Sequence, residues 1–574
     1  MQLRHLKVEN FRGIATLDWS PEGAFCCMIG PGDAGKSTVL DAIEAALSPR
    51  WFVFGEHDFI GGDTSKTISI EVTVGELSKA LKSDERLGLY IRGWSTAREM
   101  REEPEGDDEP VLTVRLTVDA TLEPVWQIVC DRADEPRTIS NRDRTLFGLV
   151  RLAGDDARHL AWGQGSILSR LTGDSDEAAA KLAGAYKAAR DSANLGDIEA
   201  LATAAGAAER FAKGLGAYVE GGYGPGLELG RGGVSTGSIA LHDGGVPLRL
   251  AGLGSRRLAT LAIQKSAITE GAIVLVDEIE HGLEPHRVMG AISQLRADQT
   301  KAAAEGKPIG HILLTTHSEV ALGEAGAASL GVCRTVRPQR TTTIVKPGAS
   351  DVIRGIMRFA PRALFSRRIL VSEGNTEVGI LNGVREFWPA LHGGLPIEHV
   401  GGFIADGNGA EAPAIALGLR ALGFEVAVYR DSDNALAVDV AARFVEAGIP
   451  VIEYGGGLDV EHAIISEAND GQMQRLIELL RAERGEGKIN DNLRPALELS
   501  AAGIALGFDA WEVSSPHDGA EIRKRVADIC VERRWLKDQR IARGAGSIAW
   551  DIAQSEPESP LAHSFAAARA WLYA

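Results

Sequence analysis

The sequence has few cysteines, no long apolar run and no excess of basic residues, and each shortage argues against a class of protein. The five cysteines among 574 residues form no Cys-x-x-Cys pair, which argues against a disulfide scaffold, a zinc ribbon and an iron–sulfur cluster. No apolar stretch reaches the roughly 18 residues of a membrane span, and residues 1–12 are too charged for a signal peptide. We therefore expect a reduced, cytoplasmic protein with no membrane partner.

The charge balance is acidic. The chain has 61 Lys and Arg against 79 Asp and Glu, a formal net charge of −18. A protein held to nucleic acid by bulk charge normally carries clustered Lys and Arg, so the composition argues against that class. It leaves room for a nucleic-acid enzyme that has a local basic groove and uses its acidic residues to hold metal.

The hydrophobic pattern predicts an α/β protein with more than one domain. A chain of 574 residues exceeds what one core usually holds. Fully apolar strands that alternate with helical segments predict parallel sheets covered on both faces. Period-2 alternation at 64–74 and 111–118 adds an antiparallel part, and the charged segment 98–109 predicts an exposed loop. The apolar strands are expected at 25–29, 273–276, 311–315, 369–372, 426–429 and 451–454.

We place the main domain boundary near 347–365, which gives a first domain at 1–350 and a second at 366–574, the latter with a helical C-terminal part. Within the first domain, the segment at about 175–215 is Ala-rich and polar and predicts two or three helices. Heptads are not sustained there, which excludes a long coiled coil. We interpret the segment as a helical insert, either a scaffold or a dimerisation element.

A phosphate-binding loop is predicted after the first apolar strand. The segment 30–37 reads GPGDAGKS and fits G-x-x-x-x-G-K-[ST], between a strand and a helix as the motif requires. Its glycines let backbone N–H groups wrap the phosphates, Lys36 reaches the β- and γ-phosphate oxygens, and the Ser37 hydroxyl ligates Mg²⁺. We therefore expect ATP as a ligand. The nucleotide-binding residues expected here are Gly30, Gly32, Gly35, Lys36, Ser37 and Thr38.

Two later strands supply the rest of an ATPase site. The apolar run 273–276 ends at Asp277, expected to hold the magnesium shell, and at Glu278, expected to polarise the attacking water. About forty residues further on, a second apolar strand ends close to His317. The order of these motifs resembles ABC-type ATPase heads of the SMC and RecF kind, which also begin with a strand and a turn like NFRG at 10–13. This resemblance implies that His317 senses the γ-phosphate and that ATP binds between two protomers.

The chain departs from that pattern in two places. Such heads usually have Asn at the third loop position and Gly or Asn at the fourth, where this chain has Gly32 and Asp33. A carboxylate beside a polyphosphate is repulsive unless a metal or a base compensates, so we expect modest ATP affinity. The signature segment falls at 250–254, with Ala251 in place of its serine.

After the boundary, three predicted strands end in acidic residues. The first leads into E-G-x-x-E, the second into D-x-D, and the third through glycines to two further acids. Parallel strands present their carboxyl ends at one edge of a sheet, so these side chains should lie together. Oxygen donors without a Cys or His pair suit Mg²⁺ or Mn²⁺, whereas the alternative is solvated strand ends or helix caps. The expected metal ligands are Glu373, Glu377, Asp431, Asp433, Asp459 and Glu461, with Ser37 in the first domain.

This ordered set of acids resembles the Toprim domain. The seven tyrosines show no context for a topoisomerase nucleophile, and the cysteines cannot form the zinc module of a bacterial-type primase. An ATPase head followed by Toprim resembles the OLD (overcoming-lysogenization-defect) family of ATP-dependent endonucleases, and the length is similar to that of the nuclease subunit of Gabija-type phage-defence systems. The resemblance implies that Glu373 serves in acid–base chemistry or metal binding and that Lys537, in the segment WLK, stabilises the transition state. It also implies DNA as substrate, a homodimer or higher homo-oligomer, and a helicase as a possible partner.

The sequence thus predicts a nucleotide-regulated, divalent-metal-dependent DNA endonuclease that acts in phage defence or DNA processing. One alternative is a non-cutting ABC-type clamp for DNA repair whose acidic site has decayed. Another is an RNA-directed nuclease, because no base-reading motif is evident in either domain.

Overall fold

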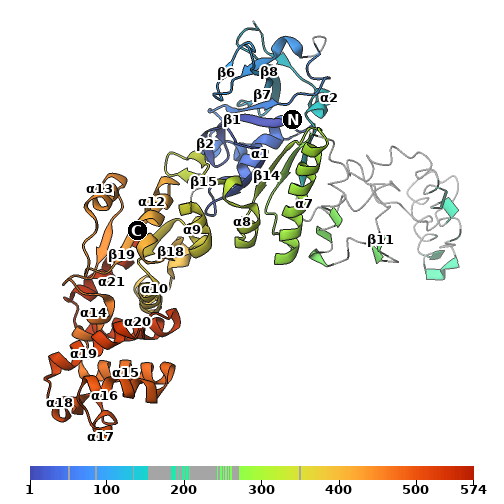
Figure 1. Ribbon diagram of the computed structural model, residues 1–574. Helices are drawn as coiled ribbons and strands as arrows, with labels where there is room; N and C mark the ends of the chain where they lie inside the picture. The colour runs from blue at the N-terminus through green and yellow to red at the C-terminus, as the bar shows by residue number, and fades with distance from the viewer. Residues whose placement is uncertain are drawn as a thin grey trace.

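Two sheets organise the chain, one in each half, and the C-terminal helices lie at the end farthest from the N-terminal strands (Figure 1). The computed structural model describes residues 1–49, 52–83, 87–133, 135–152, 271–347 and 351–574, together with scattered residues between 181 and 260. The helices and the two sheets confirm the predicted α/β class. Of the described helices, none combines the length and apolar character needed to cross a membrane.

The parallel part of the first sheet carries the phosphate-binding loop. Its strands run in the order β10 (Leu149–Leu152), β13 (Ile273–Val276), β14 (His311–Thr315), β3 (Phe25–Ile29) and β15 (Leu330–Val336). Every residue of β13 and β14 is buried, as expected of strands covered on both faces. Successive side chains along each strand face opposite sides of the sheet. Those on one side pack against α1 (Lys36–Leu47), and those on the other against α7 (Pro285–Ala304) and α8 (Glu319–Ala325).

Beyond β15 the sheet continues as a largely antiparallel extension, in which β16 and β2 are a parallel pair. The central strands alternate inward and outward, and Ile70 of β4 lies between Val8 and Leu116 in register. This order, with the loop strand β3 inside a parallel core and an antiparallel extension beside it, matches the predicted ABC-type head. The strands of the extension are β16 (Thr341–Val345), β2 (Ile14–Trp19), β1 (Gln2–Phe11), β4 (Ile68–Gly75), β7 (Glu109–Val118), β8 (Pro124–Val129) and β9 (Arg137–Thr138).

The prediction of an exposed loop at 98–109 is wrong in two details. The segment contains the short strand β6 (Met100–Arg101), which pairs with β5 (Arg92–Trp94) at the sheet edge, and its last residue, Glu109, begins β7; the rest is turns and irregular chain. The helix α2 (Asn141–Arg144) follows this part of the chain. The predicted insert at 175–215 and the signature segment at 250–254 lie largely outside the described residues. Between these two segments, β11 (His242–Asp243) and β12 (Val246–Pro247) form a short antiparallel pair.

The second sheet is parallel throughout, in the order β18 (Gly402–Asp406), β17 (Arg368–Ser372), β19 (Glu425–Arg430) and β20 (Val451–Glu453). Three of these strands were predicted, and β18 was not. Helices α12 (Ala412–Ala421) and α13 (Val438–Ala447) share a core with one face, whereas α10 (Asn375–Val384) and α14 (Val460–Glu467) pack on the other. The remaining helices are α11 (Trp388–Leu391), α15 (Asp470–Arg484), α16 (Glu486–Ala496), α17 (Ala501–Ile504), α18 (Trp511–Ser514), α19 (Gly519–Glu532), α20 (Gln539–Ser555) and α21 (Pro560–Tyr573).

The two sheets are joined by packed structure. The helix α9 (Asp351–Phe359) and the 3-10 helix η10 (Pro361–Phe365) connect them. One buried cluster contains Val332 of the first sheet, Ile356 and Leu364 of this connection, and Ile369 of the second sheet. The apolar core is therefore continuous across the predicted boundary, and a change in one half has a packed route to the other.

Candidate functional site

The phosphate-binding loop joins β3 to α1 and has the backbone that its glycines allow. Gly30 and Gly35 have φ of 141° and 90°, in the region that favours glycine. A side chain at Gly30 would also collide with the carbonyl oxygen of Cys333 on β15. Lys36 is buried, and its Nζ donates to the carbonyl oxygens of Gly30 (3.0 Å) and Pro31 (2.9 Å). Burial lowers the pKa of Lys36, and nearby acids, including Asp277, oppose that shift.

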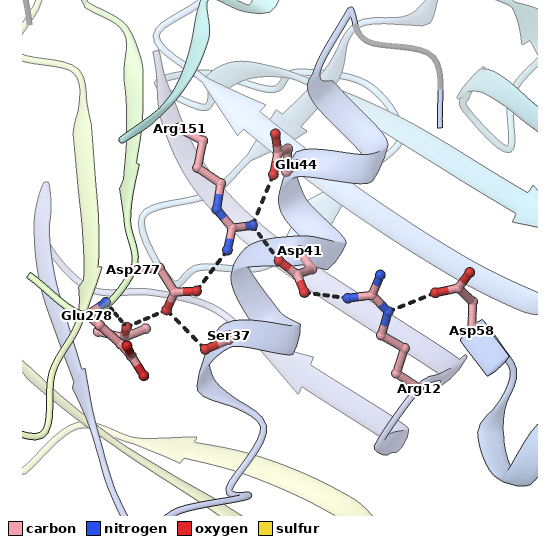
Figure 2. A network of polar contacts seen from close by, with 9 residues as sticks. Arg12, Ser37, Asp41, Glu44, Asp58, Arg151, Asp277 and Glu278 are labelled. Carbon is pink, nitrogen blue, oxygen red and sulfur yellow. Dashed lines mark hydrogen bonds and ion pairs between the residues drawn. The ribbon is translucent and has the colours of Figure 1, made fainter. Parts of the chain in front are cut away.

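The predicted magnesium ligands of the head lie next to each other (Figure 2). The Ser37 hydroxyl donates to Asp277 Oδ1 at 3.0 Å, and the Thr315 hydroxyl donates to the same oxygen at 2.7 Å. Asp277 follows β13, and Ser37 lies in the first turn of α1, which follows β3. The parallel strands of the sheet therefore bring the two residues together. Oxygen donors so arranged at the N-terminus of a helix suit a Mg²⁺–nucleotide complex.

Arg151, at the edge strand β10, completes this arrangement and was not predicted. It donates to Asp277 Oδ2 at 2.9 Å, and it also pairs with Asp41 and Glu44 on α1. Arg12, from the NFRG turn, pairs with Asp41 on the other side (Figure 2). Two arginines and a chain of acids thus tie the turn, the helix α1 and the end of β13 into one network.

Replacing Arg151 with glutamine should lower the free energy of unfolding of the head by about 3 kcal/mol, because the loss of one partner of a buried ion pair leaves the other uncompensated. The Arg151 side chain is only 13% exposed, and Asp277 and Glu44 depend on it. Denaturant unfolding of the variant would be compared with that of Arg142→Gln, which removes an exposed arginine from α2. Equal midpoints for the two variants would show that the network is not stabilising.

Glu278 and His317 flank the nucleotide site. Glu278 has a left-handed backbone (φ 45°), which is held by its N–H donating to the Thr315 hydroxyl at 2.9 Å, and its side chain is 53% exposed. The backbone N–H of His317 donates to Glu280 at 2.6 Å. Burial, followed by the charge of Lys36, lowers the pKa of His317. The His317 ring also lies 6.2 Å from the ring of Phe365 in η10, centroid to centroid.

In the second sheet, Glu373 and Asp431 lie side by side because they follow adjacent parallel strands. The register pairs Ser372 with Tyr429, and the N–H of Glu373 donates to the Tyr429 carbonyl at 2.9 Å. The N–H of Asp431 approaches Glu373 Oε2 at 3.4 Å. Arg430, which was not predicted, lies 3.7 Å from the same carboxylate. Glu373 is therefore held at the strand end, where its side chain stays 38% exposed.

Glu377 and Glu461 are buried beside them, each 2% exposed. Glu377 accepts the N–H of Gly374 at 2.8 Å and so caps α10, on which it lies. Burial raises the pKa of Glu461 to about 7, and the charge of Glu377 adds to the shift while Lys537 opposes it. Burial also raises the pKa of Asp431 to about 9, and the charges of Glu377, Glu373, Glu461 and Asp433 raise it further. The predicted acids therefore gather at one edge of the sheet.

This group of acids fits a divalent cation by its chemistry. Asp431 Oδ1 and Glu461 Oε1 are buried and have no hydrogen-bond partner among the described residues. Unpaired buried carboxylates cost free energy, and a cation would remove that cost. All the donors are oxygens, which suits Mg²⁺ or Mn²⁺. In the described part of the chain, no three such side chains already stand at metal-ligating distance, so a cation would have to draw them together.

The other predicted residues of this site differ in how they are engaged. Asp459 caps α14 by accepting the His462 N–H at 2.8 Å and contacts the His462 ring at 2.7 Å, so its Oδ1 serves the helix. Asp433 is exposed and accepts a hydrogen bond from Asn434. Lys537 is exposed too, and its charge lowers the pKa of Glu377 and Glu461.

A further acid at this edge was missed by sequence reasoning. Asp406 ends β18, opposite Ser372 in the register, and its Oδ1 accepts the Asn408 N–H at 2.8 Å. The signal that could have found it is the short run 402–406, four apolar or small residues before an acid. The strand was overlooked because glycines surround it and only one of its residues has a large apolar β-branched side chain.

Comparisons with known proteins found similarities over parts of the chain. A family model described as "AAA domain, putative AbiEii toxin, Type IV TA system" matches residues 180–323, the range that contains Asp277, Glu278 and His317. A protein named OLD nuclease from Thermus scotoductus (strain ATCC 700910 / SA-01) is 38% identical over 74 residues. That match covers 12% of this chain and 14% of the length of that protein.

Among solved structures, two SMC heads and RecF have some similarity to this chain. An SMC head bound to the C-terminal winged-helix domain of ScpA has 15% identity and a TM-score of 0.34, covering 62% of this chain and 100% of that one. The SMC head of Thermotoga maritima has 13% identity and a TM-score of 0.28, over 60% and 99%. A RecF–ATP structure has 11% identity and a TM-score of 0.29, over 55% and 94%.

Proposed function

We propose that this chain is an OLD-family nuclease with an ATPase domain, as its motifs and its matches suggest. We propose further that it is a divalent-metal-dependent endonuclease, which cleaves DNA at the acidic edge of its second sheet. The observation that carries the proposal is that Asp431 Oδ1 and Glu461 Oε1 are buried without a hydrogen-bond partner among the described residues, near the charges of Glu377 and Glu373. Acids so close together need a cation, and oxygen-bound divalent cations are the usual agents of phosphodiester hydrolysis. We assign this half to the Toprim type.

In the proposed chemistry, three acids bind the metal and a fourth accepts a proton. Glu377, Asp431 and Glu461 would hold Mg²⁺ or Mn²⁺, which supplies charge stabilisation and a nucleophilic water when bound. Glu373 keeps an exposed carboxylate at the strand end and can take a proton from the water that attacks phosphorus. The charge of Lys537 acts to lower the pKa of Glu377 and Glu461. An ammonium near these acids would stabilise the negative charge that develops on the phosphate.

The head binds ATP in this proposal, with Lys36 on the phosphates and Ser37 and Asp277 on its magnesium. Glu278 is half exposed, and heads of this kind close on ATP between two copies, so we expect a homodimer or a larger homo-oligomer. A role in phage defence and a helicase partner, as in Gabija-type systems, are the physiological setting that the resemblance suggests.

The connection between the sheets offers a route for regulation by ATP. His317 contacts Phe365 of η10, and Arg362 of η10 pairs with Glu319, two residues after His317, at 2.6 Å. The chain then passes directly into β17 and Glu373. A shift of His317 toward a γ-phosphate would therefore be transmitted to the strand that carries Glu373.

The test is cleavage of supercoiled plasmid, with the metal removed and returned. EDTA should stop nicking completely, and Mg²⁺ or Mn²⁺ in excess should restore it, because every proposed ligand is an oxygen. Zn²⁺ at equal free concentration is the control and should not restore full activity. Cleavage that persists in excess chelator would exclude this site. Single-stranded RNA in parallel reactions separates the RNA-directed alternative, and no cleavage of any substrate would favour the non-cutting clamp.

A further inference from the structure

A cavity of about 400 Å³ lies where the head meets the second sheet. On the head side its walls are residues 31–34, the first half of the phosphate-binding loop, together with Arg334 and Arg337 near the end of β15. On the other side they include Arg367, just before β17, and Arg420, in the last turn of α12. Both halves of the chain therefore contribute to one cavity.

The charge in this cavity is predominantly positive. Four arginines line it, against two acids, Asp33 and Glu425. Glu425 is already paired with Arg368 at 2.5 Å. No carboxylate among the described residues lies within ion-pair distance of any of the four arginines. In a chain with a net charge of −18, the cavity is a local excess of positive charge, and an anion would relieve the repulsion between its arginines.

Two of the arginines are held in place by neutral groups. Arg334 lies over the ring of Phe424, 4.5 Å from its centroid, and donates to the Ser366 carbonyl at 3.2 Å. Arg420 donates to the carbonyl oxygens of Ala447 (2.8 Å) and Phe424 (3.2 Å). Burial lowers the pKa of Arg334, the charge of Glu425 opposes that shift, and the charge of Arg367 adds to it. Neutral groups thus hold two of the guanidinium groups in position in the cavity.

The cavity differs from the nucleotide site already described. Lys36, Ser37, Asp277 and Glu278 do not line it, so the residues expected to bind the magnesium and the γ-phosphate belong to a different site. Asp33, the unusual residue of the loop, does line the cavity, where the arginines offset its charge. The shared wall means that a ligand in the cavity would touch the loop and the second sheet together.

We propose that this junction cavity is a second anion site, which takes a small phosphorylated ligand, either a nucleotide or an inorganic polyphosphate. Guanidinium forks match phosphate oxygens in pairs, which explains four arginines better than a requirement for positive charge alone. A volume of about 400 Å³ is in the range of small-ligand pockets and is too enclosed for a nucleic-acid duplex. Binding there would link the loop of the head to β17 without using the magnesium site.

The test is calorimetric titration of inorganic pyrophosphate into the full chain carrying Lys36→Ala, which removes phosphate binding by the head. The variant Arg337→Ala with Arg367→Ala in that background removes two cavity arginines whose side chains make no hydrogen bond or ion pair with the described residues. We expect its dissociation constant to rise at least tenfold. Arg494→Ala with Arg533→Ala, two exposed arginines of the C-terminal helices, is the matched control and should bind like its parent. Arg337→Lys with Arg367→Lys in the same background should retain part of the binding that the alanine variant loses.

Several results would overturn the proposal. One is the absence of pyrophosphate binding in the Lys36→Ala protein, and another is equal binding by the cavity and control variants. A third is a loss that affects only a DNA oligonucleotide, which would make the arginines a nucleic-acid surface. Parallel titrations with ATP, AMP and tripolyphosphate identify whether the ligand is a nucleotide or an inorganic anion. Cleavage assays on the same proteins are separate, so failure of the nuclease proposal would not affect this outcome.

Discussion

Replacing Asp431 with asparagine should lower plasmid cleavage by more than about a hundredfold, because loss of a direct ligand costs more than loss of an outer-shell partner. ATP binding should be unchanged, since Asp431 belongs to the second sheet. The metal-free variant should melt at or above the temperature of the wild type. The substitution removes a carboxylate that burial and its neighbours Glu377 and Glu373 make unfavourable in its charged form.

The melting measurement separates loss of a ligand from loss of the fold. Asp439→Asn, on the exposed side of α13, is the matched control and should cut like the wild type. Glu373→Gln should behave as Asp431→Asn does in the cleavage assay. A correctly folded Asp431→Asn protein that nicks plasmid at the parental rate would contradict the assignment of the acidic edge.

The second large effect is expected in the head. Lys36→Ala should abolish ATP binding, because Lys36 is the only basic residue of the loop 30–37 and its buried Nζ, which donates to the loop carbonyls of Gly30 and Pro31, is expected to bind the phosphates. Glu278→Gln should keep ATP bound and slow its hydrolysis by at least about a hundredfold, since the amide cannot polarise the attacking water. Equilibrium binding of a fluorescent ATP analogue and phosphate release measure the two effects separately.

If the head gates the nuclease, the two head variants should shift cleavage in opposite directions. Lys36→Ala fixes the nucleotide-free state, and Glu278→Gln prolongs the ATP-bound state. A nuclease that responds to nucleotide must differ between those states. Plasmid cleavage by both variants would be measured across an ATP titration, with Phe365→Ala as a third protein that removes the contact to His317. Identical, ATP-independent cutting by all three would exclude gating and leave the nuclease assignment intact.

Where an apolar strand ends at a chemically distinctive residue, the sequence predicted the structure closely. The strands β3, β13 and β14 have the expected bounds. Strands that are buried on both faces of a sheet are short apolar runs bounded by polar residues or glycine, and such runs can be read from the sequence. The acidic edge was predicted from the same logic, since parallel strands bring the residues after them to one edge. Those predictions required only local pattern and the geometry of parallel sheets.

The features that were missed depend on contacts between distant segments. Arg151 reaches Asp277 across 126 positions of sequence, and nothing near it marks it as a partner. Asp459 is a different case, because its contact is local. The sequence around it is the same whether it ligates a metal or caps α14, and the structure shows the cap through the His462 N–H. The packing of α9 and η10 against both sheets also could not be read from a segment that resembles a linker.

The most direct test of the central claim is a titration of Mn²⁺ into nucleotide-free protein, in which electron paramagnetic resonance counts the unbound ion. We expect the wild type to bind Mn²⁺ at the acidic edge. Asp431→Asn should lose this binding, and Asp439→Asn should retain it. Identical binding curves for the wild type and Asp431→Asn would contradict it, because the acids that follow β17 and β19 would then not hold the metal.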